Sequence, residues 1–156
     1  MIKFIPLGGA DEIGASCFYI EIAGTGLLLD CGIHPRLKGL EALPNFDTLS
    51  DLSVDFVFIS HAHQDHLGGL PFLIKRFPHI KIFATEQTKE IAAITLHNAV
   101  NILKNDYETD NPFPIYSHEE IDFLVRSMVE VKYNETIELS GLRHTSSYKL
   151  KISFHD

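Results

Sequence analysis

The amino-acid sequence predicts an α/β fold of the α+β kind, a mixed β-sheet with helices packed on it. Short strand-like runs come first, strand and helix patterns then alternate, and strands return at the end. The apolar run 54–59 is typical of a buried strand, and two later stretches repeat apolar residues every three or four positions, as helices do. A chain of 156 residues, 45% of them hydrophobic, can bury the core of one such domain.

The first third of the chain is expected to form strands and a long loop. A short strand ends at paired glycines, a hairpin follows, and Pro35 and Pro44 then block long regular elements. The expected strands are 3–7, 16–22 and 27–30, with the hairpin turn at 24–26 and an irregular stretch at 34–53.

The rest of the chain begins with the buried strand, which extends to residue 60. A helix is expected over 67–77, where Pro78 ends it, and Thr85 is the expected N-cap of the next helix. Ser117 and Glu120 have the spacing of a capping box that opens a third helix. The other expected elements are strands at 80–84, 131–133, 135–139 and 149–154, helices at 85–103 and 117–130, and a loop at 105–116.

Three histidines and one carboxylate lie within six residues directly after the buried strand: His61, His63, Asp65 and His66. Open α/β sheets place their ligand sites at this end of a strand, and zinc accepts both imidazole nitrogen and carboxylate oxygen. His61 and His63 alternate, so they share one side of an extended segment, and Asp65 and His66 follow after the bend. We therefore predict a site for two metal ions; the alternative is a solvated histidine-rich turn.

This pattern, followed by Gly68 and Gly69, resembles the metal motif of the metallo-β-lactamase fold. The stretches 6–14, 27–35 and 42–44 are similar to the β-CASP branch, which includes ribonuclease J and the endonuclease that cleaves pre-mRNA 3′ ends. The resemblance covers nearly the whole chain and implies a four-layer αββα sandwich. Because the chain has elements for about one half, residues 1–156 are expected to be the amino-terminal part of the domain, without its remainder and without the β-CASP insertion.

The resemblance also implies a function for the full-length parent, cleavage of RNA phosphodiester bonds by a hydroxide that two zinc ions activate. His61 and His63 would hold one zinc ion, and Asp65 and His66 the other. Asp65 would also orient the water or take its proton. Asp30 would support the metal loop from behind the ligands; a role in accepting turn N–H groups is the alternative, and both can hold.

The next ligand of the family, a histidine, is expected just beyond Asp156. Because a catalytic zinc ion takes three protein ligands and each pair here supplies two, we expect this chain to bind zinc weakly and to be inactive by itself. Half of a sandwich also exposes an apolar sheet face, so we expect self-association or poor solubility.

Two other function classes stay open. One is a hydrolase of the same fold acting on a small ester, thioester or lactone. The other is a non-catalytic interaction subunit, although such relatives usually lose metal ligands. A later Gly-His turn followed by a large insertion would favour the nuclease over the small-molecule hydrolase, and a single compact domain would favour the hydrolase.

Composition limits partners and compartment. The formal net charge of −8 predicts a weak grip on RNA by this chain alone. No apolar run reaches the roughly 18 residues of a membrane span, so no membrane association is expected. Cys17 and Cys31 are expected to be free thiols, which favours a reducing compartment, the cytoplasm or, in a eukaryote, the nucleus.

Several polar residues outside the cluster are weaker candidates. Asp11 and Glu12 would lie near the site by resemblance, or in a solvated loop. His34 would line a substrate path or lie on a surface loop. His155 is a weaker ligand candidate than the histidine expected just beyond Asp156. Solvated or capping roles are expected for the remaining histidines outside the cluster, which are His79, His97, His118 and His144.

Overall fold

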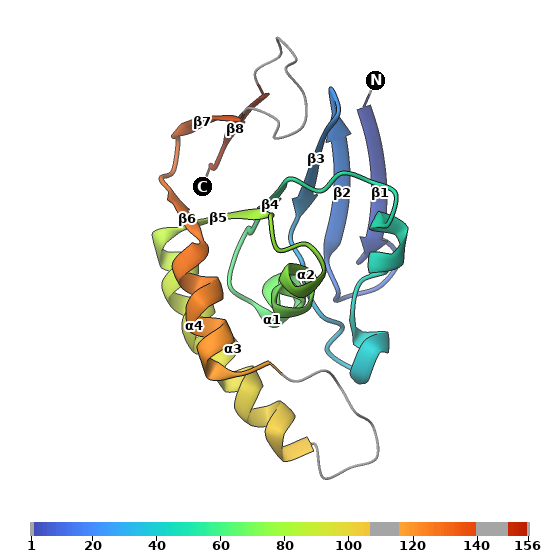
Figure 1. Cartoon of the computed structure of the whole chain (residues 1–156), viewed down its shortest axis with the longest axis vertical. Coiled ribbons are helices and arrows are strands. Elements are labelled where there is room, and N and C mark those ends of the chain that lie inside the picture. Colours follow the sequence, from blue (N-terminus) through green and yellow to red (C-terminus); the bar gives the residue numbers. More distant parts are fainter. Residues whose placement is uncertain (1, 107–115, 140–149, 156) are drawn as a thin grey trace.

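The computed structural model describes residues 2–106, 116–139 and 150–155, and in this part of the chain a six-stranded mixed sheet carries helices on one face (Figure 1). The sheet strands are β1 (Ile2–Gly8), β2 (Cys17–Ile22), β3 (Thr25–Leu29), β4 (Phe56–Phe58), β5 (Lys81–Thr85) and β6 (Val129–Val131). The helices are α1 (Gln64–Leu67), α2 (Leu70–Arg76), α3 (Glu86–Asp106) and α4 (His118–Ser127). A second, two-stranded sheet contains β7 (Thr136–Leu139) and β8 (Leu150–Ser153).

The order of strands in the sheet follows the chain. β1, β2 and β3 are antiparallel neighbours, whereas β3, β4, β5 and β6 run parallel. This confirms the predicted mixed sheet. Because parallel strands end at the same edge, the segments that leave β3 and β4 meet there, and that meeting builds the site.

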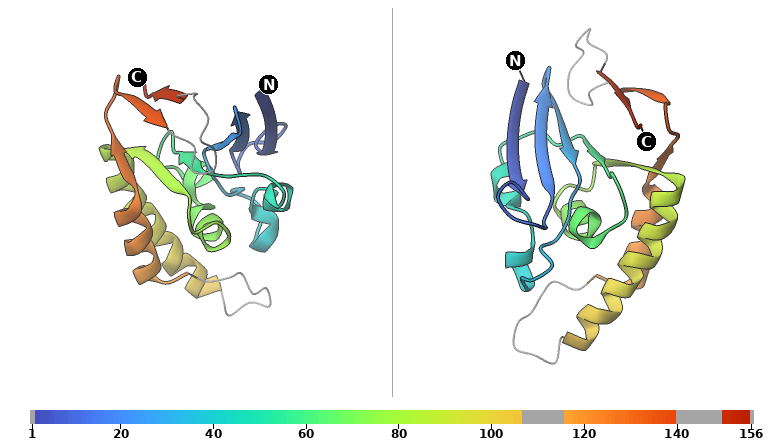
Figure 2. Two further views of the ribbon diagram at one scale, coloured as in Figure 1. Left: turned by 45° about the horizontal axis from the view of Figure 1, so that its top comes forward. Right: turned by 180° about the vertical axis from the view of Figure 1, so that it is seen from behind.

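Successive side chains of each strand point to opposite faces of the sheet, so the core is divided into two clusters. On one face of the sheet Val57 and Leu28 pack with the four helices, which include α3 and α4 lying side by side (Figure 2). On the other face Phe56, Phe58 and Phe83 pack with Leu139 of β7. The smaller sheet therefore covers only part of that face.

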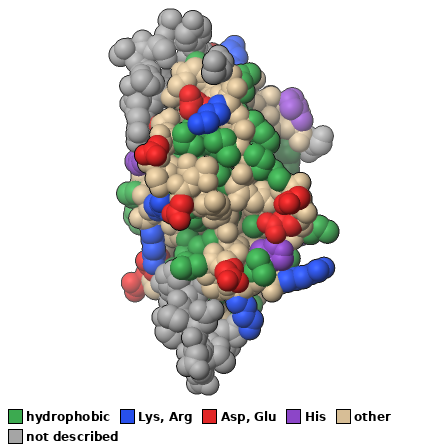
Figure 3. Space-filling view, turned by 90° about the vertical axis from the view of Figure 1, so that its right-hand side faces the viewer, with side chains coloured by type: hydrophobic (Ala, Val, Ile, Leu, Met, Phe, Trp, Pro, Cys, Tyr) green, Lys and Arg blue, Asp and Glu red, His purple; other side chains and the backbone are tan. Residues whose placement is uncertain are grey.

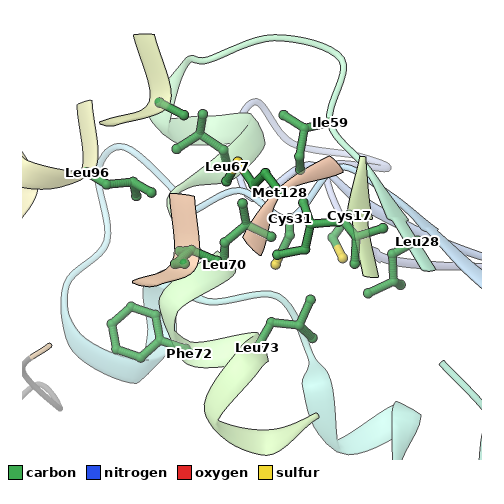
Figure 4. Close-up of a cluster of buried hydrophobic side chains, with 14 of the residues drawn as sticks. Cys17, Leu28, Cys31, Ile59, Leu67, Leu70, Phe72, Leu73, Leu96 and Met128 are labelled. Carbon is green, nitrogen blue, oxygen red and sulfur yellow. The ribbon is translucent and has the colours of Figure 1, made fainter. Parts of the chain in front are cut away.

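The helix-side core lies directly beneath the turn that joins β4 to α1. Ile59 and Leu67, at the two ends of that turn, are fully buried among leucines of α2 and α3 (Figure 4). Cys17 and Cys31 lie in the same cluster as buried free thiols, as predicted, and burial raises the pKa of Cys31 well above its usual value. The turn is thus anchored at both ends by apolar packing.

The predicted strands agree with the structure to within two residues at each end, and the larger differences are at the hairpin turn and in the helices. The hairpin turn is Ala23–Gly24, with φ of 51° and 80°, so the predicted turn at 24–26 was one residue late. The predicted helix 67–77 corresponds to α2, which begins three residues later, at Leu70. The short helix α1 precedes it, was not predicted, and is separated from α2 by Gly68 and Gly69. A Cβ on Gly69 would lie 3.0 Å from the Cys31 carbonyl oxygen, and the close approach of that segment interrupts the helix.

The two later helices also end elsewhere than predicted. α3 extends to Asp106, past the predicted end at 103, and α4 stops at Ser127 because Met128 is extended and β6 joins the main sheet. The irregular stretch 34–53 contains two 3-10 helices, Gly39–Ala42 and Phe46–Leu49. Most of the predicted loop 105–116, residue 149 of the last strand and His144 lie outside the described residues. No helix in the described ranges is long and apolar enough to cross a bilayer.

Candidate metal centre

The predicted metal cluster lies on the turn between β4 and α1, which carries His61 and His63, and on α1, which carries Asp65 and His66. The segment that follows β3 holds this part of the chain in place through backbone hydrogen bonds: Cys31 N–H to His66 O (2.7 Å), Ile33 N–H to Gln64 O (3.0 Å) and Gly69 N–H to Cys31 O (2.8 Å). Ser16, just before β2, adds a bond from its N–H to Asp65 O (2.9 Å). The turn is therefore fixed by the main chain, independently of any ion.

Gly32 permits this close approach. A Cβ at Gly32 would lie 1.7 Å from the carbonyl oxygen of Asp65, far inside van der Waals contact. Any side chain would push the two segments apart. The glycine in the Asp-Cys-Gly stretch is thus explained by contact with the turn that carries the candidate ligands.

The four candidate ligand side chains form two neighbouring pairs. His61 Nε2 lies 3.1 Å from His63 Nδ1, and His66 Nε2 lies 3.6 Å from Asp65 Oδ2. The rings of His61 and His66 are 4.0 Å apart between centroids, so the two pairs adjoin. Two donors on one tetrahedral zinc ion, each bound at ~2.0–2.1 Å, stand roughly 3.3 Å apart, close to both spacings.

Asp30 joins the pairs from behind. Its Oδ1 accepts the Ser60 backbone N–H at 2.7 Å, and its Oδ2 accepts the Ser60 hydroxyl at 2.8 Å. The same Oδ2 lies 2.8 Å from His66 Nδ1. A carboxylate oxygen can only accept, so the proton of His66 sits on Nδ1 and the lone pair of Nε2 faces the cluster. Both roles considered for Asp30, accepting turn N–H groups and supporting a ligand, have contacts here.

Ser60 extends the same arrangement to His61. Its hydroxyl group donates a hydrogen bond to Asp30, so Ser60 Oγ is left to accept a hydrogen bond from His61 Nδ1–H at 2.9 Å. The Nε2 lone pair of His61 therefore points toward His63. Sequence reasoning missed Ser60. The available signal was a hydroxyl residue between the strand and the first histidine, paired with an aspartate at the end of the neighbouring strand.

The pKa of His61 is below its usual value of 6.5. Partial burial disfavours the imidazolium, and the nearby His66 and His63 add repulsion, against which Asp30 and Asp65 act more weakly. The imidazole is therefore neutral at neutral pH, which is the form that binds metal ions.

The donor set fits zinc by residue type and by pair spacing, but each pair contributes two groups. Within residues 2–106, 116–139 and 150–155, no three His, Cys, Asp or Glu side chains are placed to hold one ion. A catalytic zinc ion takes three protein ligands and a water. In the described part of the chain, neither pair completes such a ligand set by itself.

The weaker candidates have other partners. Asp11 and Glu12 are exposed, and Glu12 Oε2 lies 3.6 Å from His34 Nε2. His34 Nδ1 accepts the backbone N–H groups of Arg36 and Leu37, and its ring also borders a cavity described below.

The histidines far from the cluster in sequence bind elsewhere. His79 bonds the Val54 carbonyl, and His155 bonds Ser153 and Asn134. His97 lies 2.8 Å from His118 and 3.1 Å from Asp122, which links α3 to α4.

Histidine and carboxylate donors on a turn after a central strand of a mixed sheet define an α/β protein of a metal-binding class. The chain belongs to the metallo-beta-lactamase superfamily, whose family model matches residues 10–130. An archaeal metallo-beta-lactamase superfamily protein from Sulfolobus tokodaii has the same fold, with a TM-score of 0.50 and 19% identity over 87% of this chain and 50% of that one.

Curated relatives confirm the predicted resemblance to pre-mRNA 3′-end endonucleases. "Cleavage and polyadenylation specificity factor subunit 3-I" of Arabidopsis thaliana is 32% identical over 88% of this chain. "Endoribonuclease YSH1" of Kluyveromyces lactis is 32% identical over 93%, and "Cleavage and polyadenylation specificity factor 73" of Drosophila melanogaster is 33% identical over 92%. The chain spans 20% of the length of each of these relatives.

Proposed function

We propose that this chain is the amino-terminal part of a metal-dependent endoribonuclease of the β-CASP branch, and that its His61–His66 turn contributes to the centre that cleaves RNA. The observation that carries the proposal is the Asp30–Ser60 network. It directs the Nε2 lone pair of His61 toward His63 and that of His66 toward Asp65. The similarity to a protein named endoribonuclease supports RNA as the substrate.

Each residue has a role in this proposal. His61 and His63 hold one ion, and Asp65 and His66 hold the second, with zinc the natural choice for such donors. Zinc, when bound, lowers the pKa of water to about 7 and offsets charge on a phosphoryl group. Asp65 orients the attacking water or takes its proton, and Asp30 keeps the proton of His66 on Nδ1.

The rest of the centre lies in a later part of the parent protein. The third ligand for each ion would come from there, as would much of the RNA contact. The chain has 13 basic and 21 acidic residues, and Figure 3 shows Lys and Arg scattered among acidic side chains on one face rather than gathered in a stripe. The 156-residue chain alone is therefore proposed to be inactive.

The other function classes are less well supported. Hydrolysis of a small ester, thioester or lactone uses the same ligands, but the names of the relatives favour RNA. A non-catalytic subunit would not need the preserved pairs. The relatives are eukaryotic and two are named cleavage and polyadenylation factors, which favours the nucleus over the cytoplasm.

The test uses the longer protein that contains this chain. We expect it to cleave a synthetic RNA. His63→Ala should abolish cleavage and remove the zinc ion that His61 and His63 hold, measured by elemental analysis, and since His63 is exposed the substitution should cost little packing. His79→Ala, an exposed histidine elsewhere, is the control. An undiminished zinc content in His63→Ala, or turnover of p-nitrophenyl esters without RNA cleavage, would contradict the proposal.

A further inference from the structure

A cavity of about 740 Å³ lies beside the candidate metal turn, between the 33–42 segment and α3. Gln64, which directly follows His63, forms part of its wall. Gln64 Nε2 donates to the Thr95 carbonyl at 3.0 Å, and Thr95 Oγ1 donates to the Ala62 carbonyl at 3.3 Å. The wall of the cavity and the turn with the candidate ligands are therefore parts of one hydrogen-bonded unit.

The lining combines apolar walls with a few amide groups. Ile33, Pro35 and Phe72 contribute apolar surface, while Asn98 contributes an exposed amide that can both donate and accept. The Gln64 amide is committed to this unit, because its Nε2 donates to Thr95 and its Oε1 is buried, so the amide open to the cavity is that of the exposed Asn98.

The charge of the lining differs from that of the chain. The protein has a net charge of −8, yet no Asp or Glu is among the described residues that line the cavity, where Lys38 is the basic group besides His34. Such a lining suits a flat, uncharged ring that is attached to an anion. Volumes of 300–1,000 Å³ are typical of sites that enclose ligands of nucleoside size.

We propose that this cavity receives an unpaired nucleobase of the RNA strand, next to the phosphodiester held at the metal turn. The inference rests on the proposed ribonuclease function. The Asn98 amide reads the hydrogen-bonding edge of the base, the apolar walls enclose its faces, and the Lys38 ammonium pairs with the adjoining phosphate. Single-stranded RNA is commonly read in this way, by burying splayed bases and hydrogen-bonding their edges.

The test measures base binding by the purified chain without metal and without cleavage. The fluorescent riboside of 2-aminopurine is the probe, and since the protein has no Trp, no indole emission interferes. We expect saturable quenching that natural nucleosides reverse by competition. Asn98→Phe, at an exposed position of α3, fills the cavity and should weaken probe binding at least roughly tenfold, or 1.4 kcal/mol.

Two further variants keep the result interpretable. Ile91→Phe adds the same ring two turns earlier on α3, outside the lining, and should bind the probe as the parent chain does. Ile102→Tyr fills the cavity from a second exposed position and should repeat the loss if Asn98→Phe does not fold.

Three results would overturn the inference: no saturable quenching, quenching that survives both cavity-filling variants, or displacement by indole as effective as by nucleosides. Because the assay contains no metal and no scissile RNA, these results leave the proposed cleavage untouched. If this chain binds the base but the intact longer protein does not cleave RNA, the proposed function is rejected and the inference about the cavity stands.

Discussion

The carboxylate of Asp30 decides which nitrogens of the candidate ligands are free. It lies one residue past β3, in the left-handed backbone region at φ 58°, and its side chain is 12% exposed. From that position it accepts from Ser60 and from His66, and through Ser60 it also fixes the ring of His61. Metal-binding histidines in proteins are generally oriented in this way by a carboxylate or carbonyl.

The role of Ser60 gives a prediction at this scale. Ser60→Ala removes the hydroxyl that links Asp30 to His61, so the Nδ1 proton of His61 is no longer directed. We expect zinc affinity, measured by calorimetry, to fall roughly 10-fold to 100-fold. Ser50→Ala, which removes a hydroxyl bonded to Arg76 on the surface, should leave the affinity unchanged. Equal zinc affinities for Ser60→Ala and the unsubstituted chain would reject this role of Ser60.

Gly32 gives a second prediction. Gly32→Ala places a methyl group against the Asp65 carbonyl, and overpacking of this kind costs about 1–3 kcal/mol of unfolding free energy. Urea denaturation should show the loss, together with changed amide shifts in residues 64–66. A variant as stable as the parent would mean that the two segments can separate without cost.

Among the elements, α4 is the one whose start is most locally determined. Ser117 Oγ accepts the Glu120 N–H at 3.1 Å, and Glu120 Oε2 accepts the Ser117 N–H at 2.6 Å, so both bonds of the predicted capping box are present. The Ser117 backbone N–H, and next the Lys75 ammonium, hold the pKa of Glu120 below its usual 4.5.

Removal of the capping box should therefore lower the free energy of unfolding by an amount that depends on pH. Ser117→Ala is expected to lower the unfolding free energy by about 1 kcal/mol at neutral pH. A carboxylate with a lowered folded-state pKa contributes stability above its unfolded pKa, near 4.5, and loses it as pH falls through the folded-state value. Glu120→Gln should thus be less stable than the parent chain above pH 4.5, and the two should converge in acid. Urea titrations that stay parallel across this range would contradict the assignment.

Local signals of this kind predicted the elements well, and tertiary contacts caused the errors. The capping box, the alternation in the strands and the ligand spacing all act within a few residues, and each was predicted. The break between α1 and α2 depends on Cys31, and the Asp30–Ser60 pair joins residues thirty positions apart. Neither contact can be located without the parallel pairing of β3 and β4.

At the scale of the whole molecule, the described residues cover one face of the sheet only in part. β7 packs over β4 and β5, whereas Ile2 and Phe4 of β1 are 70% and 58% exposed, and Leu29 of β3 is also exposed. The Phe4 ring stacks on Phe18 at 6.0 Å between centroids, which makes a flat apolar surface. Contiguous exposed apolar surface of this kind often marks an interaction site, which is why we expect association here.

Self-association through this face is the prediction at this scale. Phe4→Ser should shift the sedimentation coefficient of the chain toward that of a monomer, because it removes the most protruding ring of the patch. Phe123→Ser, a 75% exposed phenylalanine on α4, is the matched control and should not change the association. A parent chain that is monomeric at high concentration would contradict the prediction.

The most direct measurement of the central claim is imidazole NMR of the chain during zinc titration. The claim is that the turn after β4 gathers its ligands for metal ions, and NMR detects weak binding that purification would lose. We predict that the ring nitrogens of His61, His63 and His66 shift together and saturate, while those of His97 and His118, which pair with each other across α3 and α4, stay unchanged. Shifts confined to the His97–His118 pair, or no shift in the three histidines of the turn, would contradict it.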